Sequence, residues 1–112
     1  MHEIAVCEAI AGTVRERARD RSPASVRVRI GHLRQVVPDS LLFSWEMVTA
    51  GTDLEGCTLV VDYVPAVVVC ADCGARTTLE IPVLGCGSCN GSDVELVSGN
   101  EFDLASFDVA AA

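Results

Sequence analysis

The sequence predicts an α+β fold, in which two helices and a small mixed three-stranded sheet form one domain that is interrupted by a short cysteine-rich module. Three observations lead to this prediction. Two segments repeat apolar residues every three or four positions, other segments have the alternating or continuous apolar character of strands, and four cysteines lie in two close pairs. With 112 residues, half of them hydrophobic, the chain can bury one modest core.

The first helix is predicted over residues 4–18. Four arginines at positions 15, 17, 19 and 21 crowd its end, where positive charge meets the negative end of the helix dipole, and Ser22-Pro23 then stops the helix. We interpret these arginines as a solvated helix end; a docking site for an acidic partner is the alternative. The predicted buried face consists of Cys7, Ile10, Ala11, Val14 and Ala18.

A strand and a second helix follow. The segment Val26–Leu33 alternates strictly and predicts a half-buried strand, with its valines and Ile30 on one face and its arginines on the other. Pro38 suits the first position of a helix that Gly51 can terminate. The predicted apolar residues of this helix are Leu41, Leu42, Trp45 and Val48, with Trp45 in the core.

Two further strands complete the predicted sheet. The first is Leu59–Val64, which Pro65 ends because proline cannot donate to the ladder. The second is Val94–Leu104, with a bulge at Gly99, and it returns the chain to the sheet of the first domain. We expect Phe102, Leu104 and Phe107 to complete the core, and Ala110–Ala112 to fray.

Four cysteines form two CxxC pairs: Cys70 with Cys73, and Cys86 with Cys89, twelve residues further on. Two such turns can close a tetrahedron of thiolates around Zn²⁺, and four sulfur ligands leave no position for water, so a structural zinc is predicted. Disulfides and a rubredoxin-like iron centre are the alternatives. Nearby glycines at 74, 87 and 91 suit tight turns.

The zinc-ribbon-like module is placed at residues 67–92, and residues 1–66 and 93–112 form the α+β domain. Two cysteines remain, Cys7 on the helix face and Cys57 before a strand, and both are predicted to be packing thiols. His32, at a strand end, has no assigned metal role.

Charge and composition exclude several classes of function. The net charge is −8, and residues 35–112 carry one arginine against twelve acidic residues, so a nucleic-acid partner is not expected. The start of the chain lacks the basic and apolar regions of a signal peptide, and no apolar run approaches the ~18 residues of a membrane span. A cytoplasmic location is expected, where thiols stay reduced.

The first three residues, Met1-His2-Glu3, form a second candidate metal site. The α-amine, the amide nitrogen of His2 and its imidazole can close successive chelate rings around one ion, and Glu3 can add its amide or carboxylate. Planar, nitrogen-rich donation of this kind suits Ni(II) or Cu(II) better than zinc. By itself the pattern is weak, because histidine at position 2 is common.

Several motifs together resemble the HypA/HybF family of hydrogenase nickel-incorporation proteins. The resemblance covers almost the whole chain and implies a nickel metallochaperone for the maturation of [NiFe] hydrogenase, and in some members of urease. It also implies a HypB-type GTPase and the hydrogenase large subunit as partners. The motifs are Met1-His2-Glu3, Val28-Arg29-Ile30-Gly31, Val36-Val37-Pro38-Asp39, Glu55-Gly56-Cys57-Thr58-Leu59, Pro65-Ala66, the two CxxC pairs and Ser98-Gly99-Asn100-Glu101.

The resemblance also implies roles for individual residues. His2 takes the role of nickel ligand, Glu3 that of a ligand or of a residue needed for GTPase docking, and the four CxxC cysteines that of the zinc tetrad. Some members place a carboxylate near nickel before the second helix, and Asp39 is the nearest candidate, although Pro38 aligns with that position. A zinc-ribbon module that binds protein or nucleic acid is the alternative function, an enzyme is not expected, and monomer and homodimer stay open.

Overall fold

The computed structural model describes residues 2–109, and the chain divides into two compact units. The first unit comprises Met1–Arg29, Val36–Asp62 and Asp103–Ala112, and the second comprises Ile30–Gln35 and Tyr63–Phe102. The module predicted at residues 67–92 lies within the second unit. The fraying predicted for Ala110–Ala112 lies outside the described residues. Among residues 2–109, no helix is both long enough and apolar enough to cross a membrane.

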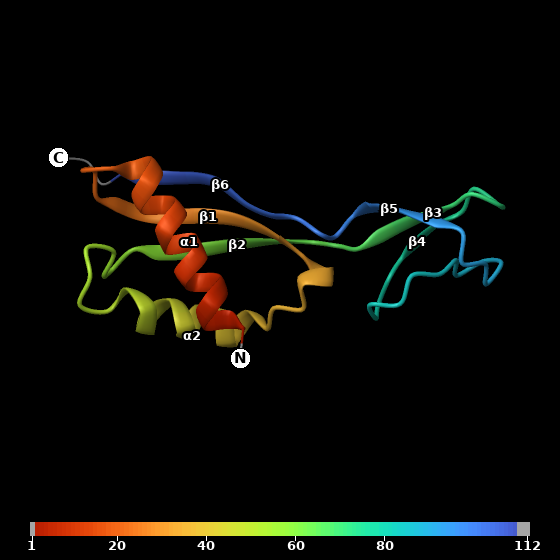
Figure 1. The fold of residues 1–112 in the computed structure, drawn as a ribbon, viewed down its shortest axis with the longest axis horizontal. Coiled ribbons are helices and arrows are strands. Elements are labelled where there is room, and N and C mark those ends of the chain that lie inside the picture. Colours follow the sequence, from red (N-terminus) through yellow and green to blue (C-terminus); the bar gives the residue numbers. More distant parts are fainter. Residues whose placement is uncertain (1, 110–112) are drawn as a thin grey trace. The chain divides into compact units, whose positions relative to one another are not determined.

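Two helices pack against each other in the first unit (Figure 1). Helix α1 spans Glu3–Ala18 and buries every residue of its predicted apolar face. Its end is capped by arginine, since the Arg21 side chain donates hydrogen bonds to the carbonyl oxygens of Ala18 and Arg17, at 3.2 and 3.0 Å. Helix α2 spans Pro38–Thr49, with Pro38 at the predicted first position.

Three strands form the sheet of the first unit in the order β2-β1-β6. They are β1 (Pro23–Gly31), β2 (Thr58–Val64) and β6 (Phe102–Val109). Strands β1 and β2 run in the same direction, joined by the crossover through α2, whereas β6 runs back (Figure 1). The sheet is therefore mixed, as predicted. Strand β1 alternates over its middle: Val26, Val28 and Ile30 are buried and the two arginines between them are exposed.

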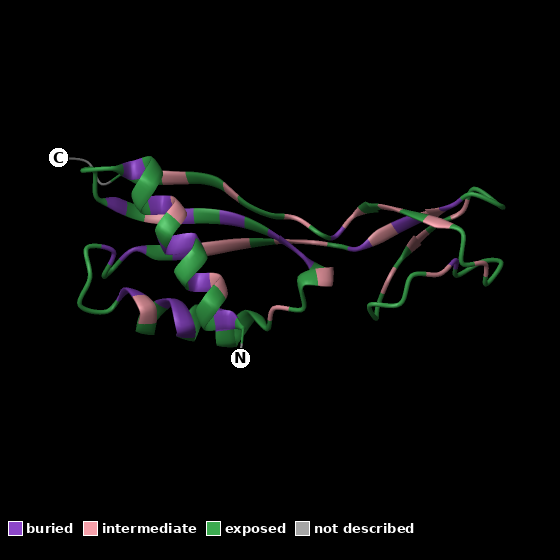
Figure 2. Cartoon of the chain, in the orientation of Figure 1, coloured by how far each residue is buried: buried purple, intermediate pink, exposed green. Residues whose placement is uncertain are grey.

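The core of the first unit lies between the two helices and one face of this sheet (Figure 2). Trp45 is buried as predicted, and its indole N–H donates to the carbonyl oxygen of Cys57 at 2.8 Å. Leu42, predicted to be part of the apolar face, is 44% exposed. The prediction for Leu42 was wrong because Leu41 and Trp45 already fill the stripe that faces α1 and the sheet. The core residues are Cys7, Ile10, Ala11, Val14, Ala18, Val26, Val28, Leu41, Trp45, Leu54, Cys57 and Leu59.

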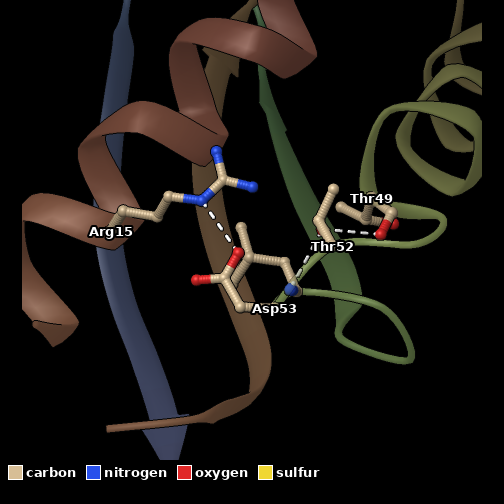
Figure 3. A network of polar contacts seen from close by, with 5 residues as sticks. Arg15, Thr49, Thr52 and Asp53 are labelled. Carbon is tan, nitrogen blue, oxygen red and sulfur yellow. Dashed lines mark hydrogen bonds and ion pairs between the residues drawn. The ribbon is translucent and has the colours of Figure 1, made fainter. Parts of the chain in front are cut away.

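The loop between α2 and β2 is held to α1 by an arginine of the predicted solvated cluster (Figure 3). Arg15 Nε donates to Asp53 Oδ1 at 3.1 Å, and beside it the Thr52 hydroxyl donates to the carbonyl oxygen of Thr49 at 2.6 Å. Both charged side chains are well exposed. Such surface ion pairs contribute at most about 1 kcal/mol, which agrees with a solvated role for these arginines.

The second unit contains a separate three-stranded sheet of order β4-β3-β5. Its strands are β3 (Val67–Cys70), β4 (Arg76–Thr78) and β5 (Val94–Ser98), and β3 pairs antiparallel with both neighbours. The short helix η1 (His32–Arg34) also belongs to this unit. Its buried hydrophobic residues are few: Ile30, Ala66, Val68, Cys70 and Cys86. So small a core needs another source of stability.

The single strand predicted at Val94–Leu104 is wrong, because the chain leaves β5 and begins β6 after a break at Gly99. Gly99 has φ +111° and donates its N–H to Glu101 Oε1 at 2.9 Å. A side chain at Gly99 would also collide with the backbone of Ala66. The irregular residue is therefore not a bulge within one ladder but the junction between strands of two sheets.

The aromatic residues near the C-terminus do not complete the core as predicted. Phe102 is 38% exposed, and the Arg34 guanidinium lies 5.7 Å from its ring centroid. Phe107 is half-buried, with the Arg21 guanidinium 5.2 Å from its ring centroid. Because the core already contains enough aliphatic side chains, these rings are covered by arginines at the surface instead.

Leu41→Ala is expected to lower the free energy of unfolding by about 2–5 kcal/mol, because Leu41 is fully buried and its removal leaves a cavity. Leu42→Ala is the matched control: it removes the same atoms from the next position, where the side chain is 44% exposed, and should change stability by less than about 0.5 kcal/mol. Urea unfolding followed by Trp45 fluorescence measures both. Equal losses would contradict the core described above.

Candidate metal centre

The structure brings the sulfur atoms of the four CxxC cysteines together, all within 4.8 Å of one another. The Sγ atoms of Cys70 and Cys89 are 3.6 Å apart, as are those of Cys73 and Cys86. These separations exceed a disulfide bond of about 2.05 Å. They match the about 3.8 Å expected between sulfurs that surround one ion tetrahedrally at about 2.3 Å. The cluster can therefore hold one metal ion with four thiolates.

The two CxxC turns have the same backbone hydrogen bonds. In the first, Cys70 N–H donates to Ala75 O at 3.0 Å and Gly74 N–H donates to Cys70 O at 2.9 Å. In the second, Cys86 N–H donates to Gly91 O at 2.9 Å and Asn90 N–H donates to Cys86 O at 3.0 Å. Each turn thus aims its pair of sulfurs at one point.

The left-handed position of each turn is occupied by a residue with positive φ: Gly74 at +74° and Asn90 at +61°. The sequence favoured glycines here, but in the second turn Asn90 takes this conformation, which asparagine tolerates well. Gly87 instead allows close approach, since its N–H donates to Thr77 Oγ1 at 3.0 Å. Asn90 and Thr77 therefore help to shape the second CxxC turn, and the sequence analysis identified neither of them.

Two backbone amides stabilise the thiolate of Cys86. The N–H groups of Cys89 and Ser88 both donate to Cys86 Sγ at 3.4 Å. These two bonds lower the pKa of the Cys86 thiol to about 6. Cys70 and Cys86 are buried, while Cys73 and Cys89 are exposed, so one side of the cluster faces solvent.

Cys7 and Cys57 lie apart from this cluster, in the core of the first unit, as predicted. Burial raises the pKa of the Cys7 thiol to about 11, and the nearby Glu3 charge adds to the shift. Burial also raises the pKa of Cys57. Cys7 Sγ donates to the carbonyl oxygen of Leu41 at 3.4 Å. Both thiols are therefore protonated and inert at neutral pH.

These environments predict that the six thiols react with a thiol reagent in two steps. After EDTA removes bound metal from the native protein at pH 7, four thiols should react rapidly with a chromogenic disulfide reagent. Cys7 and Cys57 should react only after guanidinium is added, because both thiols are buried in the core of the first unit and burial raises the pKa of each. Rapid reaction of all six thiols without denaturant would contradict the packing roles.

The N-terminus of α1 carries the second candidate site. His2 is the N-cap residue, and its Nε2 lies 3.2 Å from Glu3 Oε2. The Glu3 side chain is only 8% exposed, and the same oxygen accepts a hydrogen bond from the backbone N–H of Val37 at 3.4 Å. The imidazole, by contrast, is half exposed. Glu3 is thus anchored between the helices while His2 faces solvent.

The other residues considered as metal ligands lie in different elements. Asp39 lies in the first turn of α2 and is exposed, two residues after the Val37 amide that contacts Glu3. His32 begins η1 in the second unit, where its ring centroid is 6.5 Å from that of Tyr63. The α-amine of Met1, the remaining predicted donor, lies outside the described residues. The Val37 amide could not be found from sequence, since its partner is distant in the chain.

Comparison with known proteins decides the family. A family model described as "Hydrogenase/urease nickel incorporation, metallochaperone, hypA" matches residues 1–109. The chain belongs to the HypA family. The resemblance inferred from its motifs is thereby confirmed.

Similarity to individual proteins also supports membership of the HypA family. The hydrogenase maturation factor HypA of Streptomyces avermitilis is 40% identical over 111 residues, which cover 95% of this chain and 85% of the relative. Hydrogenase maturation factor HypA 2 of Bradyrhizobium diazoefficiens is 35% identical over 112 residues, 97% of this chain and 99% of the relative. The solution structure of the Ni metallochaperone HypA from Helicobacter pylori has the same fold, with a TM-score of 0.64 at 20% identity and full coverage of both chains.

Proposed function

We propose that this chain is a nickel metallochaperone that binds Ni(II) at its N-terminus and delivers it during the maturation of [NiFe] hydrogenase. The observation that carries the proposal is the pair His2 and Glu3 at the start of α1, in a chain of the HypA family. Urease is a further client in the proposal, since the family description names both enzymes.

The nickel donors follow from the position of the His2 ring. Because Nε2 faces the Glu3 carboxylate at 3.2 Å, its proton is donated there and Nδ1 is left as the metal donor. Nδ1 and the amide nitrogen of His2 can close one chelate ring, and the α-amine of Met1 another. Nitrogen donors in a tetragonal arrangement suit Ni(II) better than Zn²⁺. The half-exposed ring also leaves the ion accessible for transfer.

Glu3 acts in this proposal as a positioning residue, holding the imidazole from a site that is itself fixed by the Val37 amide. Glu3→Ala should weaken nickel binding about 10- to 100-fold, whereas Glu3→Gln, which keeps an oxygen acceptor, should lose less. Calorimetric titration with nickel measures both. A Glu3→Gln protein as weak as Glu3→Ala would instead make the carboxylate a direct ligand, and unchanged affinity in Glu3→Ala would remove Glu3 from the site.

The ion proposed for the four cysteines is a structural Zn²⁺. Four thiolates at tetrahedral separations fit zinc, and with all positions occupied by sulfur the ion has no place for substrate. The few buried residues of the second unit support a stabilising role. An iron centre of the rubredoxin kind would show itself by its visible absorption, which zinc lacks.

We infer a HypB-type GTPase and the hydrogenase large subunit as partners, with urease maturation proteins for the second client, and a cytoplasmic location. The net charge of −8 argues against nucleic acid. The family description is that of a metallochaperone, which agrees with a carrier and not an enzyme.

Metal analysis tests the function directly. Protein with its native N-terminus, dialysed with and without added nickel, should contain one zinc in both cases and about one additional nickel in the second. Nickel-loaded protein should then restore nickel to the metal-free large subunit when the GTPase and GTP are present. A chain that holds zinc and retains no nickel would favour the alternative, a zinc-ribbon binding module.

A further inference from the structure

The outer face of α2 is apolar where a surface helix is ordinarily polar. Phe43 is 63% exposed and Met47 55%, and they lie one turn apart on the same side of the helix. Leu42 beside them, Val37 before the helix and Ile4 on α1 are exposed as well. Single exposed apolar residues need no explanation, but a group of large ones on neighbouring turns marks an interaction surface.

Two hollows flank this helix. One, of about 260 Å³, lies between α1 and α2 and is lined by Glu3, Ile4, Ser40, Phe43 and Ser44. The other, of about 420 Å³, lies on the side of α2 that faces the start of β2, and Leu42, Trp45 and Glu46 contribute to its lining. A helix ridge with an apolar hollow on each side can receive the side chains of a partner, which a flat surface cannot.

Within residues 2–109, the carboxylates of this face have no neutralising partner. Helix α2 contains no basic residue, and the side chains of Asp39 and Glu46 make no ion pair or hydrogen bond with any other described residue. Acidic residues on the sheet differ, because Asp62 accepts two bonds from Arg27 at 2.9 and 3.0 Å. The face therefore presents apolar side chains beside carboxylates whose negative charge no neighbouring basic side chain neutralises.

We propose that this α2 face, formed by Ile4, Val37, Leu42, Phe43 and Met47 with Asp39 and Glu46, docks a partner protein that presents apolar side chains among lysines or arginines. Charge complementarity selects such an occupant. A second copy of this chain fits poorly, since two faces in contact would bring carboxylates of the same sign together.

The position of the face connects docking to nickel transfer, and this step rests on the proposed function. Ile4, Phe43 and Glu3 line the same hollow, and Glu3 contacts the His2 ring. A partner seated on α2 therefore covers the carboxylate that holds the proposed nickel ligand. Nickel can then pass to the partner over a short distance without release into solution.

Titration of the zinc-loaded, nickel-free chain with the purified GTPase, and separately with the hydrogenase large subunit, tests the docking. Phe43→Ser/Met47→Ser should weaken the affinity for at least one of them more than about tenfold. Ile81→Ser/Val83→Ser is the matched control, since these residues are equally exposed, at 65% and 62%, but belong to the second unit. It should leave the affinity unchanged.

Charge is tested with Glu46→Lys, because Asp39 is itself a candidate nickel-site residue. This variant should slow association and reduce its dependence on salt, whereas Glu95→Lys on β5 should do neither. The inference is overturned if neither protein binds the unmodified chain, or if both bind all variants equally. It is also overturned if Phe43→Ser/Met47→Ser abolishes only self-association of the chain. Since no nickel is present, failure of nickel binding would not affect these outcomes.

Discussion

Cys73→Ala is expected to remove the metal ion and unfold the sheet β4-β3-β5, while α1, α2 and the sheet β2-β1-β6 stay folded. The physical reason is that the second unit has a small core, so the free energy of metal binding, about 10–16 kcal/mol in small structural zinc sites, is a large part of its stability. Zinc content by atomic emission, together with amide hydrogen exchange residue by residue, measures both effects.

Asp72→Ala is the matched control for this experiment. Asp72 lies in the same turn as Cys73 and is exposed. Its carboxylate makes no hydrogen bond or ion pair with another described residue, so its removal tests the turn without removing a ligand. The variant should keep a full equivalent of zinc and unchanged amide protection. If Cys73→Ala did the same, the tetrad would not be the metal site. Collapse of protection in α1 and α2 as well would mean that the two units do not fold independently.

His2→Ala should weaken nickel binding by more than about 100-fold and leave the zinc content unchanged, because it removes the imidazole donor of the exposed site. A residue added ahead of Met1 should weaken binding comparably, since it displaces the α-amine from the chelate. Calorimetry on untagged protein measures the affinity. His32→Ala, which removes the other histidine of the chain, is the control and should bind nickel normally.

Two results would contradict the assignment of nickel to the N-terminal residues. Equal affinity of the extended and native proteins would exclude the α-amine as a donor. A loss of nickel binding in His32→Ala as large as in His2→Ala would show that the N-terminal residues alone do not make the site.

Local patterns alone determined much of this protein. The spacing of apolar residues predicted α1 and its buried face correctly, because helix periodicity is a property of consecutive residues. Strict alternation identified β1 for the same reason. The four cysteines could be grouped from sequence, since each CxxC turn is local and two such turns have few other uses. Family membership followed from motifs spread along the chain.

The tertiary structure decided what depends on contacts between distant residues. Gly99 divides the predicted third strand, where its φ of +111° departs from extended backbone. Ala66 leaves no room for a side chain at this position, and neither residue alone indicates this. The burial of Glu3 depends on the Val37 amide, 34 positions away. Leu41 and Leu42 are chemically identical, yet one is in the core and the other on an exposed face. Periodicity defines which residues share a face, but only packing decides how much of that face is covered.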